Sequence, residues 1–453
     1  MSNRTKSYEI DMCHGPLFGK ILKYSLPLIA SGLLNFCYNI VNTAMLGRFS
    51  GSAAMAAVGS TGAVISLFIS LFMGLSVGIN VLVARAFATK NKNDLQEIVH
   101  TAVLMGLIIG VFVAVSGFFV ARPLLLMTGT PKEIIKPATT YMRIYFFGFL
   151  ASSVSSFSSA VLNGVGDTRR PFFFSVFNST IHILLNLLFI VVLDMSVVGV
   201  ATSTAIVQFS GAILNVSCLM RSKGDYHLDV RKLKIHKDKL KKMAFIGVPS
   251  GLQSTATGIT NTIVQAAVNS FGFLVVAGNT ASNNLGNLVY ICIAAYHSTT
   301  LTFVSQNYGA GKIKRVLKII RTCFTIVTVI GILLGGALYI FAEPLLKIYT
   351  SDKEAIAAGV LRIALVYLTH SLYGWTDVLA AALRGMGRSA LSMIITMSGL
   401  CGFTIVWIYT VFKYSHTLAT LYSVYPIAWV LTSIVYIICL TVIIKKIGKK
   451  HRI

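Results

Sequence analysis

The sequence predicts an all-α polytopic membrane protein with twelve transmembrane helices in two pseudo-symmetric six-helix lobes. Three observations support this fold class: 55% of the 453 residues are hydrophobic, only 12% are charged, and the second half of the chain repeats the first. A soluble domain carries about 25% charged residues. A nucleic-acid-binding protein could carry the net charge of +25, but it would not place its basic residues between long apolar runs. The hydrophobicity also excludes a disordered chain.

Twelve segments are long and apolar enough to cross a bilayer, which takes roughly 20 residues per helix. They lie near residues 21–46, 60–84, 101–121, 139–162, 171–192, 196–218, 243–269, 281–305, 322–342, 358–383, 389–411 and 422–444. Six of the seven cysteines lie inside these segments, so we interpret them as small apolar side chains and not as a disulfide framework. The polar segment 1–20 precedes a full-length span, so we do not expect a cleaved secretory signal.

The basic residues predict the orientation of the chain. With the N-terminus in the cytoplasm, 30 Lys and Arg residues fall in cytoplasmic tails and loops and seven fall outside. Because cytoplasmic loops carry the positive excess, this distribution favours a plasma (inner) membrane protein with both termini in the cytoplasm. The expected domains are a cytoplasmic N-terminal tail, an N-lobe, a basic cytoplasmic linker, a C-lobe and a basic cytoplasmic tail: 1–20, 21–220, 221–242, 243–444 and 445–453.

The internal repeat pairs the two halves of the chain at a nearly constant offset. Residues 121–135, ARPLLLMTGTPKEII, match residues 342–356, AEPLLKIYTSDKEAI, at seven of fifteen positions, and a one-residue shift pairs Asn39 with Asn261. Each repeat holds an even number of spans, so both enter the membrane in the same direction. Their symmetry axis is then expected along the membrane normal, as in parallel-repeat transporters that work by rocking and alternating access.

Polar side chains form stripes on four of the predicted spans, at helical spacings that place each stripe on one face. The members are Asn35, Tyr38, Asn39 and Asn42; Asn178, His182 and Asn186; Gln253, Thr257, Asn261 and Gln265; and His370, Tyr373 and Asp377. Such side chains face a bundle interior or water, although each one could instead provide an interhelical hydrogen bond. We predict that the substrate cavity is lined by Tyr38, Asn39, Asn42, His182, Asn186, Asn261, Gln265, His370 and Tyr373.

Asp377 is the one acidic residue well inside a span; the other thirteen lie in tails, loops or span ends. A carboxylate at the centre of a membrane helix costs about 2.5–3.5 kcal/mol on insertion scales. We therefore interpret Asp377 as an ion-coupling residue for H⁺ or Na⁺, which makes it a candidate Na⁺ ligand and a counter-charge for a cationic substrate. The alternatives are a structural Asp bonded to a neighbouring helix or to an Arg, and an Asp that faces cytoplasmic water.

Other intramembrane residues have weaker interpretations. Pro27 and Pro249 lie near the starts of spans 1 and 7 and are either hinges or helix-start prolines. His297 is expected to make a hydrogen bond in the core. Arg143 and Arg362 lie about a turn inside the outer ends of two spans, where they can extend to the surface.

No ATP-binding or metal-binding motif is present, since neither G-x-x-x-x-G-K-[ST] nor H-E-x-x-H nor a Cys/His metal set occurs. The sequence therefore predicts transport driven by an ion gradient and no enzymatic activity. We expect a monomer whose partners are a small-molecule substrate and membrane lipid. No nucleic acid and no cofactor other than H⁺ or Na⁺ as coupling ion are expected.

Several stretches together resemble the bacterial multidrug and toxic compound extrusion (MATE) family of the MOP superfamily. They are SLPLIASGLLNFCYNIVNTAMLGRFSG, MAAVGST, VLNGVGDTRRP, GNTASNN, SQNYGAGK and DVLAAALRGMG. The resemblance covers nearly the whole chain. It implies a twelve-helix, two-lobed fold and the export of mostly cationic, amphipathic compounds by H⁺ or Na⁺ antiport.

The resemblance also implies roles for single residues. Asp377 resembles a C-lobe acid implicated in Na⁺ or H⁺ coupling, and Pro27 matches a span-1 proline associated with bending. Many bacterial members have an acid in a V-D-T motif of span 1, but this chain has Val41-Asn42-Thr43. Asn42 can still form hydrogen bonds but cannot titrate, so the resemblance does not extend to the acid at this position.

Three other classes of function fit the sequence less well. The superfamily includes flippases of lipid-linked saccharides, whose pyrophosphate groups call for a basic cavity. The predicted stripes are neutral apart from one acid, which favours neutral or cationic cargo. The internal repeat argues against a channel or receptor, and no paired acid–base or metal set inside the membrane favours an enzyme.

Overall fold

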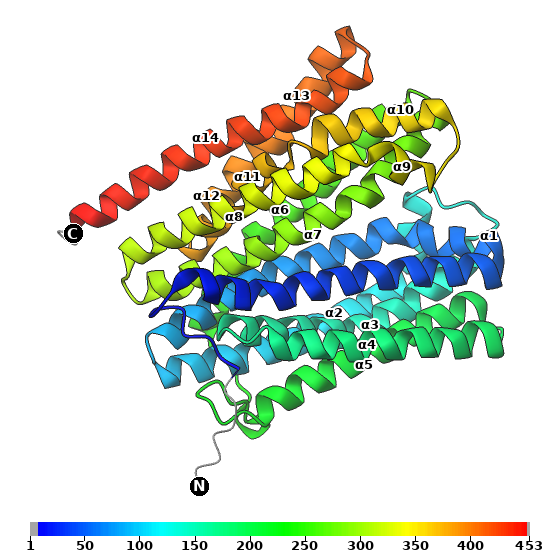
Figure 1. Ribbon diagram of the computed structural model, residues 1–453. Coiled ribbons are helices and arrows are strands. Elements are labelled where there is room, and N and C mark those ends of the chain that lie inside the picture. Colours follow the sequence, from blue (N-terminus) through cyan, green and yellow to red (C-terminus); the bar gives the residue numbers. More distant parts are fainter. Residues whose placement is uncertain (1–7, 451–453) are drawn as a thin grey trace. The chain divides into compact units, whose positions relative to one another are not determined.

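The computed structural model describes residues 8–450, and every regular element in that range is helical (Figure 1). The first half forms α1 (Leu17–Ala88), α2 (Lys92–Met127), α3 (Ile135–Gly164), α4 (Arg169–Asn186), η1 (Leu187–Val192) and α5 (Ser196–Met220). The second half follows η2 (Val230–Lys232) with α6 (Lys237–Asn269), α7 (Phe273–Gly309), α8 (Ile313–Ile340), α9 (Ala342–Lys347), α10 (Lys353–Arg362), η3 (Ile363–Tyr367), α11 (His370–Gly385), α12 (Ser389–Thr396), η4 (Met397–Gly402), α13 (Phe403–Trp407), η5 (Ile408–Phe412) and α14 (Leu418–Lys450). The all-helical prediction is confirmed, and the seven cysteines are free.

The element α1 contains two helices, which meet at Gly51. Gly51 has φ 82° and ψ 173°, a backbone conformation that side chains with a Cβ rarely adopt. The two helices of α1 run in opposite directions (Figure 1), so the connection between spans 1 and 2, which the span bounds placed over residues 47–59, is a sharp turn at this glycine.

Ten helices in the described part of the chain are long and apolar enough to cross a membrane. The pair Lys353–Tyr367 and His370–Gly385, bent by 41°, passes the same test as one broken span. The remaining predicted segment, residues 243–269, is a continuous helix in α6, but its mean hydropathy is too low to pass the same test. The polar side chains of Gln253, Asn261 and Gln265 lower its hydropathy, and Asn261 and Gln265 line a cavity described below.

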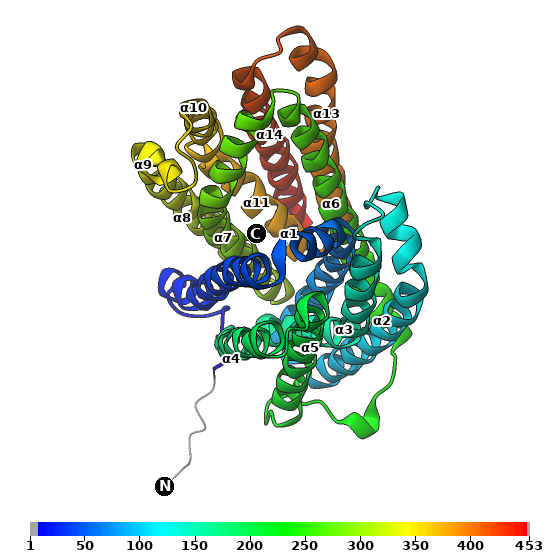
Figure 2. The same ribbon diagram turned by 90° about the vertical axis from the view of Figure 1, so that its right-hand side faces the viewer.

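The chain divides into two compact units. Unit 1 comprises Met1–Asp11 and Leu26–Gly251, and unit 2 comprises Met12–Ser25 and Leu252–Ile453. In unit 1, α3 packs against both α2 and α5, and α4 lies along α5 (Figure 2). In unit 2, α11 packs against α7, α8 and α14. The basic segment 221–242, expected to link two lobes, belongs to unit 1.

Close backbone contact joins α1 to the first part of α6 within unit 1. Gly74 and Gly78 on α1 face Gly247 and Gly251 on α6, and both pairs have small-xxx-small spacing. A Cβ at Gly74 would overlap the backbone of Gly251, and a Cβ at Gly247 would lie 2.8 Å from the Cα of Leu75. Small residues at this spacing allow membrane helices to approach closely and gain van der Waals contact.

Pro27 and Pro249 lie well inside their helices, since α1 begins at Leu17 and α6 at Lys237. This excludes the helix-start interpretation of both prolines. Each also lies within two residues of a point where its helix passes from one unit to the other, at Ser25–Leu26 and Gly251–Leu252. Proline removes an intrahelical hydrogen bond and bends a helix.

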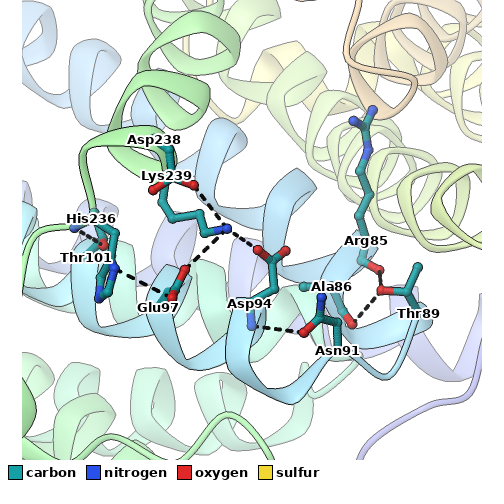
Figure 3. Close-up of polar contacts among 10 residues, drawn as sticks. All are labelled: Arg85, Ala86, Thr89, Asn91, Asp94, Glu97, Thr101, His236, Asp238 and Lys239. Atoms are coloured by element: carbon teal, nitrogen blue, oxygen red, sulfur yellow. Dashed lines mark hydrogen bonds and ion pairs between the residues drawn. The ribbon is translucent and has the colours of Figure 1, made fainter.

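A cluster of charges fixes the end of the basic segment to α2 (Figure 3). The Nζ of Lys239 contacts Asp94 and lies 3.4 Å from Glu97 Oε2 and 3.2 Å from Asp238 Oδ2. The Lys239 side chain is only 9% exposed. Three carboxylates around one buried ammonium group satisfy its donors and stabilise this junction.

We expect Lys239→Met to lower the free energy of unfolding by about 1–2 kcal/mol, between the values for exposed and buried ion pairs. The variant leaves Asp94, Glu97 and Asp238 without their shared cation. Thermal unfolding of the purified protein measures the effect. Lys242→Met, at an exposed position of the same helix, is the control and should melt like the wild type.

The pH dependence gives a second check on this cluster. Burial acts to lower the pKa of Lys239, but hydrogen bonds to Asp94 and Asp238 outweigh it and raise that pKa. The ammonium contribution is therefore present at neutral pH and lost only at strongly alkaline pH. The hydrogen bond from Lys239 lowers the pKa of Asp238. The contribution of the Asp238 carboxylate to the free energy of unfolding is therefore lost as the pH falls through the range in which carboxyl groups take up protons. The difference between wild type and Lys239→Met should shrink in acid.

Candidate functional site

Unit 1 contains a polar cavity of about 390 Å³. The described residues that line it are Asn35, Tyr38, Ser152, Ser155, Ser156, Ser175, Asn178, Ser179, His182, Val207, Gln208 and Gly211. They come from α1, α3, α4 and α5, and none of them is an acid, a Lys or an Arg. This cavity therefore presents hydroxyl, amide and imidazole groups without a fixed charge.

A hydrogen-bond chain runs from this cavity to Asn42. Tyr38 Oη lies 3.4 Å from His182 Nε2, which lies 3.1 Å from Ser203 Oγ. Ser203 donates to Asn186 Oδ1, and Asn186 Nδ2 donates to Asn42 Oδ1 at 2.8 Å. Asn42 and Asn186 thus lie behind the lining and contact it through Ser203.

Of the five residues predicted to line a cavity in this unit, the structure places Tyr38 and His182 on it. Asn39 is exposed and donates to the backbone oxygen of Asn35 on its own helix. The α3 serines and Gln208 were not predicted. Ser152, Ser155 and Ser156 have the i, i+3, i+4 spacing of one helix face, so the three serines could have been found.

Unit 2 contains a cavity of about 460 Å³, and all four residues predicted for this half, Asn261, Gln265, His370 and Tyr373, line it. Its walls come from α6, α7, α10, η3, α11, η4, α13 and α14. The lining is rich in aromatic rings: Tyr290, Tyr367, Tyr373, Tyr425 and Trp429. The His370 ring stacks on Tyr373, with centroids 5.1 Å apart, and meets Trp429 edge-on at 5.4 Å.

The two cavities use corresponding positions of the internal repeat. In the register that pairs Asn39 with Asn261, six lining positions of unit 1 have counterparts in the lining of unit 2: Asn35/Thr257, Tyr38/Thr260, Asn178/Leu400, Ser179/Cys401, His182/Thr404 and Val207/Trp429. The polar hydrogen-bonding pair Tyr38–His182 thereby corresponds to two threonines. The repeat has kept the location of the cavity and changed its chemistry.

Arg362 also lines the unit 2 cavity, and its side chain does not extend to the surface as expected. It is 6% exposed. Its Nη1 donates to Asn279 Oδ1, and its Nη2 donates to Asn283 Oδ1 at 2.7 Å. The guanidinium lies 5.3 Å from the ring centroid of Tyr422 and 5.8 Å from that of Tyr425. These amide and aromatic partners hold the charge inside the unit.

Asp377 is paired with a histidine and is not among the cavity-lining residues. Its Oδ1 lies 2.8 Å from His297 Nδ1, and the other ring nitrogen of His297 lies 3.3 Å from Arg384 Nη1. The two side chains of the pair are 18% and 16% exposed. His297 is thus a hydrogen-bonding partner, as predicted, and its partner is the intramembrane acid.

The described residues contain no group of three or more His, Cys, Asp or Glu side chains that could hold a metal ion. Na⁺ is a hard cation, for which oxygen ligands are preferred. At Asp377 the neighbouring group is an imidazole nitrogen, so the surroundings fit a proton better than a metal cation.

Comparison with known families gives the identity of the fold. The family model described as MatE matches residues 27–188 and again residues 249–410. The chain belongs to the MATE family. The second match begins at Pro249, the repeat counterpart of Pro27, where the first match begins, so the two matches confirm the internal repeat. MATE proteins are transporters, in agreement with the prediction that this chain is not an enzyme.

Three proteins similar to this MATE chain illustrate the extent of the match. The probable multidrug resistance protein YoeA of Bacillus subtilis is 23% identical, over 90% of this chain and 93% of its own. The FAD transporter of Shewanella oneidensis is 22% identical, over 85% and 86%. The structure of an outward-facing multidrug resistance MATE transporter of the MOP superfamily has a TM-score of 0.92 at 19% identity, covering 98% of this chain and all of the other. The predicted multi-span MATE fold is confirmed.

Proposed function

We propose that this MATE chain is a secondary active efflux transporter that exports amphipathic small molecules, such as drugs, toxins or metabolites, by H⁺ or Na⁺ antiport. The observation that carries the proposal is the pair of cavities at corresponding positions of the repeat. Each has the volume of a small-molecule site, about 300–1,000 Å³. The relatives named as multidrug resistance proteins support it.

Rocking of two pseudo-symmetric repeats is the mechanism that such an architecture commonly serves. In the proposal, both termini face the cytoplasm, the chain acts as a monomer, and Pro27 is a hinge. The Asp377–His297 pair is the coupling group, and H⁺ is favoured over Na⁺ because the partner of the carboxylate is an imidazole nitrogen and not a further oxygen ligand.

The structure gives less support to a cationic substrate than to an amphipathic one. No carboxylate is among the described residues that line either cavity, and the unit 2 cavity contains the guanidinium of Arg362. A second candidate function is that of a flippase of a lipid-linked saccharide, and Arg362 favours it because a pyrophosphate group calls for a basic cavity. The volume of about 460 Å³ suits a compact molecule better than a saccharide headgroup with its pyrophosphate.

Reconstitution in proteoliposomes tests the proposal. Imposed H⁺ or Na⁺ gradients should drive movement of amphipathic dyes, and an ionophore that dissipates the gradient should stop it. Dissipating only the proton gradient separates the two coupling ions. If no dye, cationic or anionic, moves under either gradient, the proposed transport is wrong.

Restoring an acid in span 1 gives a further prediction. We expect Asn42→Asp to change the pH dependence of transport, because the new carboxylate can accept the Asn186 hydrogen bond and also bind a proton. The measurement is the initial transport rate across a pH series. Asn39→Asp, on the same helix but away from the cavity, should keep the wild-type pH profile. If Asn42→Asp also keeps the wild-type profile, a coupling role for an acid at position 42 is contradicted.

A further inference from the structure

We propose that the unit 2 cavity selects amphipathic anions: aromatic compounds that carry a carboxylate or another oxyanion, held with the anionic group toward Arg362. This inference rests on the proposed transport function and names the substrate class of one of its cavities. It differs from the cationic cargo that the sequence favoured.

The charge of the lining favours an anion. Among its described residues, Arg362 carries a permanent charge and no Asp or Glu is present. The acid inside a span, Asp377, is engaged by His297 at 2.8 Å and is not among the lining residues. The lining therefore carries a net positive charge, so a cation placed here would be repelled and an anion attracted.

The guanidinium of Arg362 is held by neutral groups. Its polar partners are two amide oxygens, those of Asn279 and Asn283. The same oxygens also accept hydrogen bonds from Tyr422 and Tyr367, at 3.2 and 2.8 Å. The Nε of Arg362 has no hydrogen-bond partner among the described residues. A buried cation without a carboxylate is costly, and a bound anion would compensate it.

Aromatic rings supply the rest of the cavity. Tyr290 and Tyr373 have ring centroids 5.9 Å apart, and Tyr373 and Trp429 have centroids 5.7 Å apart. Together with the His370 ring they provide flat apolar faces on which an aromatic ligand can stack. An amphipathic anion uses both parts of the cavity, whereas an inorganic anion uses only Arg362.

Two xanthene dyes test this selectivity. Fluorescein is an anion above neutral pH, and rhodamine 123 is a cation of similar shape. Fluorescence anisotropy with the purified full-length protein in lipid nanodiscs measures both affinities. The wild type is expected to bind fluorescein more tightly than rhodamine 123. A preference for rhodamine 123 overturns the proposal, and this comparison needs no variant.

Arg362→Gln is the decisive variant. Losing a charged hydrogen-bond partner costs about 1.5–3 kcal/mol, or roughly tenfold or more in affinity. Fluorescein binding should fall by that factor, and rhodamine 123 binding should stay equal or improve. Arg362→Lys, which retains the charge, should keep the preference for fluorescein. If Arg362→Gln folds and weakens both dyes equally, or neither, charge selection by this residue is wrong.

Arg143→Gln is the matched control. Arg143 lies on α3 in the other unit, where its Nε donates to Phe118 O at 3.2 Å, and it lines neither described cavity. Both dye affinities should be unchanged in this variant. Arg362-dependent fluorescein binding without gradient-driven transport of any dye would leave the site in place and contradict the transport function instead.

Discussion

Asp377→Asn is expected to abolish gradient-driven efflux and reduce dye transport to the level of protein-free vesicles. Asparagine has the size of aspartate and can still accept a hydrogen bond from His297, now 2.8 Å from the carboxylate. It cannot take up and release a proton, so the antiport cycle has no titrating acid at this position. The measurement is transport in proteoliposomes under an imposed proton gradient.

Two controls accompany this variant, one for folding and one for the specificity of the effect. The thermal melting of Asp377→Asn should remain close to that of the wild type, because the amide fills the same space. Asp225→Asn, at a half-exposed acid that faces Lys92 at 3.6 Å, should transport normally. Wild-type transport by a folded Asp377→Asn variant would remove Asp377 from the mechanism.

His297→Gln should separate the roles of the two members of this pair. Glutamine can hydrogen-bond to Asp377 but does not titrate near neutral pH. If the pair shares the coupled proton, the variant should shift the pH profile of transport while keeping gradient dependence. A purely structural His297 would change the melting temperature and leave the profile in place.

Gly74→Leu is expected to lower the free energy of unfolding more than any other variant proposed here, by about 3 kcal/mol or more, which is the upper end for overpacking. A Cβ at Gly74 would already overlap the backbone of Gly251, and backbone cannot move aside as a flexible side chain can. The fraction of monodisperse protein on size-exclusion chromatography and the melting temperature measure the effect.

Gly62→Leu is the matched control in the same element, α1. A Cβ at Gly62 meets no atom within 4 Å, so this variant should purify and melt like the wild type or better, since glycine is a poor helix former. Equal yields for the two leucine variants would show that the α1–α6 contact tolerates expansion.

Most of the fold could be predicted, because the lengths of the apolar segments indicate the spans and matching residues in the two halves indicate the repeat. The predicted segment 243–269 is also helical, in α6, although its polar side chains lower its hydropathy. The turn at Gly51 could not be predicted, since one glycine replaced an expected loop of several residues.

The candidate site was predicted unevenly. Helical spacing placed Asn261, Gln265, His370 and Tyr373 on one cavity, because a polar stripe on a buried helix must face a common space. Spacing alone cannot say which neighbour that face meets, so Asn39 was included although it is exposed.

Arg362 was misinterpreted because its position near the end of a predicted span allows two outcomes for a long side chain. The side chain could extend outward to water or turn inward to polar partners. The partners that decide the outcome, Asn279 and Asn283, come from α7, far away in sequence. Tertiary packing, not the local pattern, put the charge in the cavity.

The exchange of helix ends between the units resembles a domain swap made within one chain. Leu17–Ser25 belongs to unit 2, and Lys237–Gly251 belongs to unit 1. Either half of the repeat, expressed alone, would lack a helical segment that its core requires and would carry one whose partner is missing.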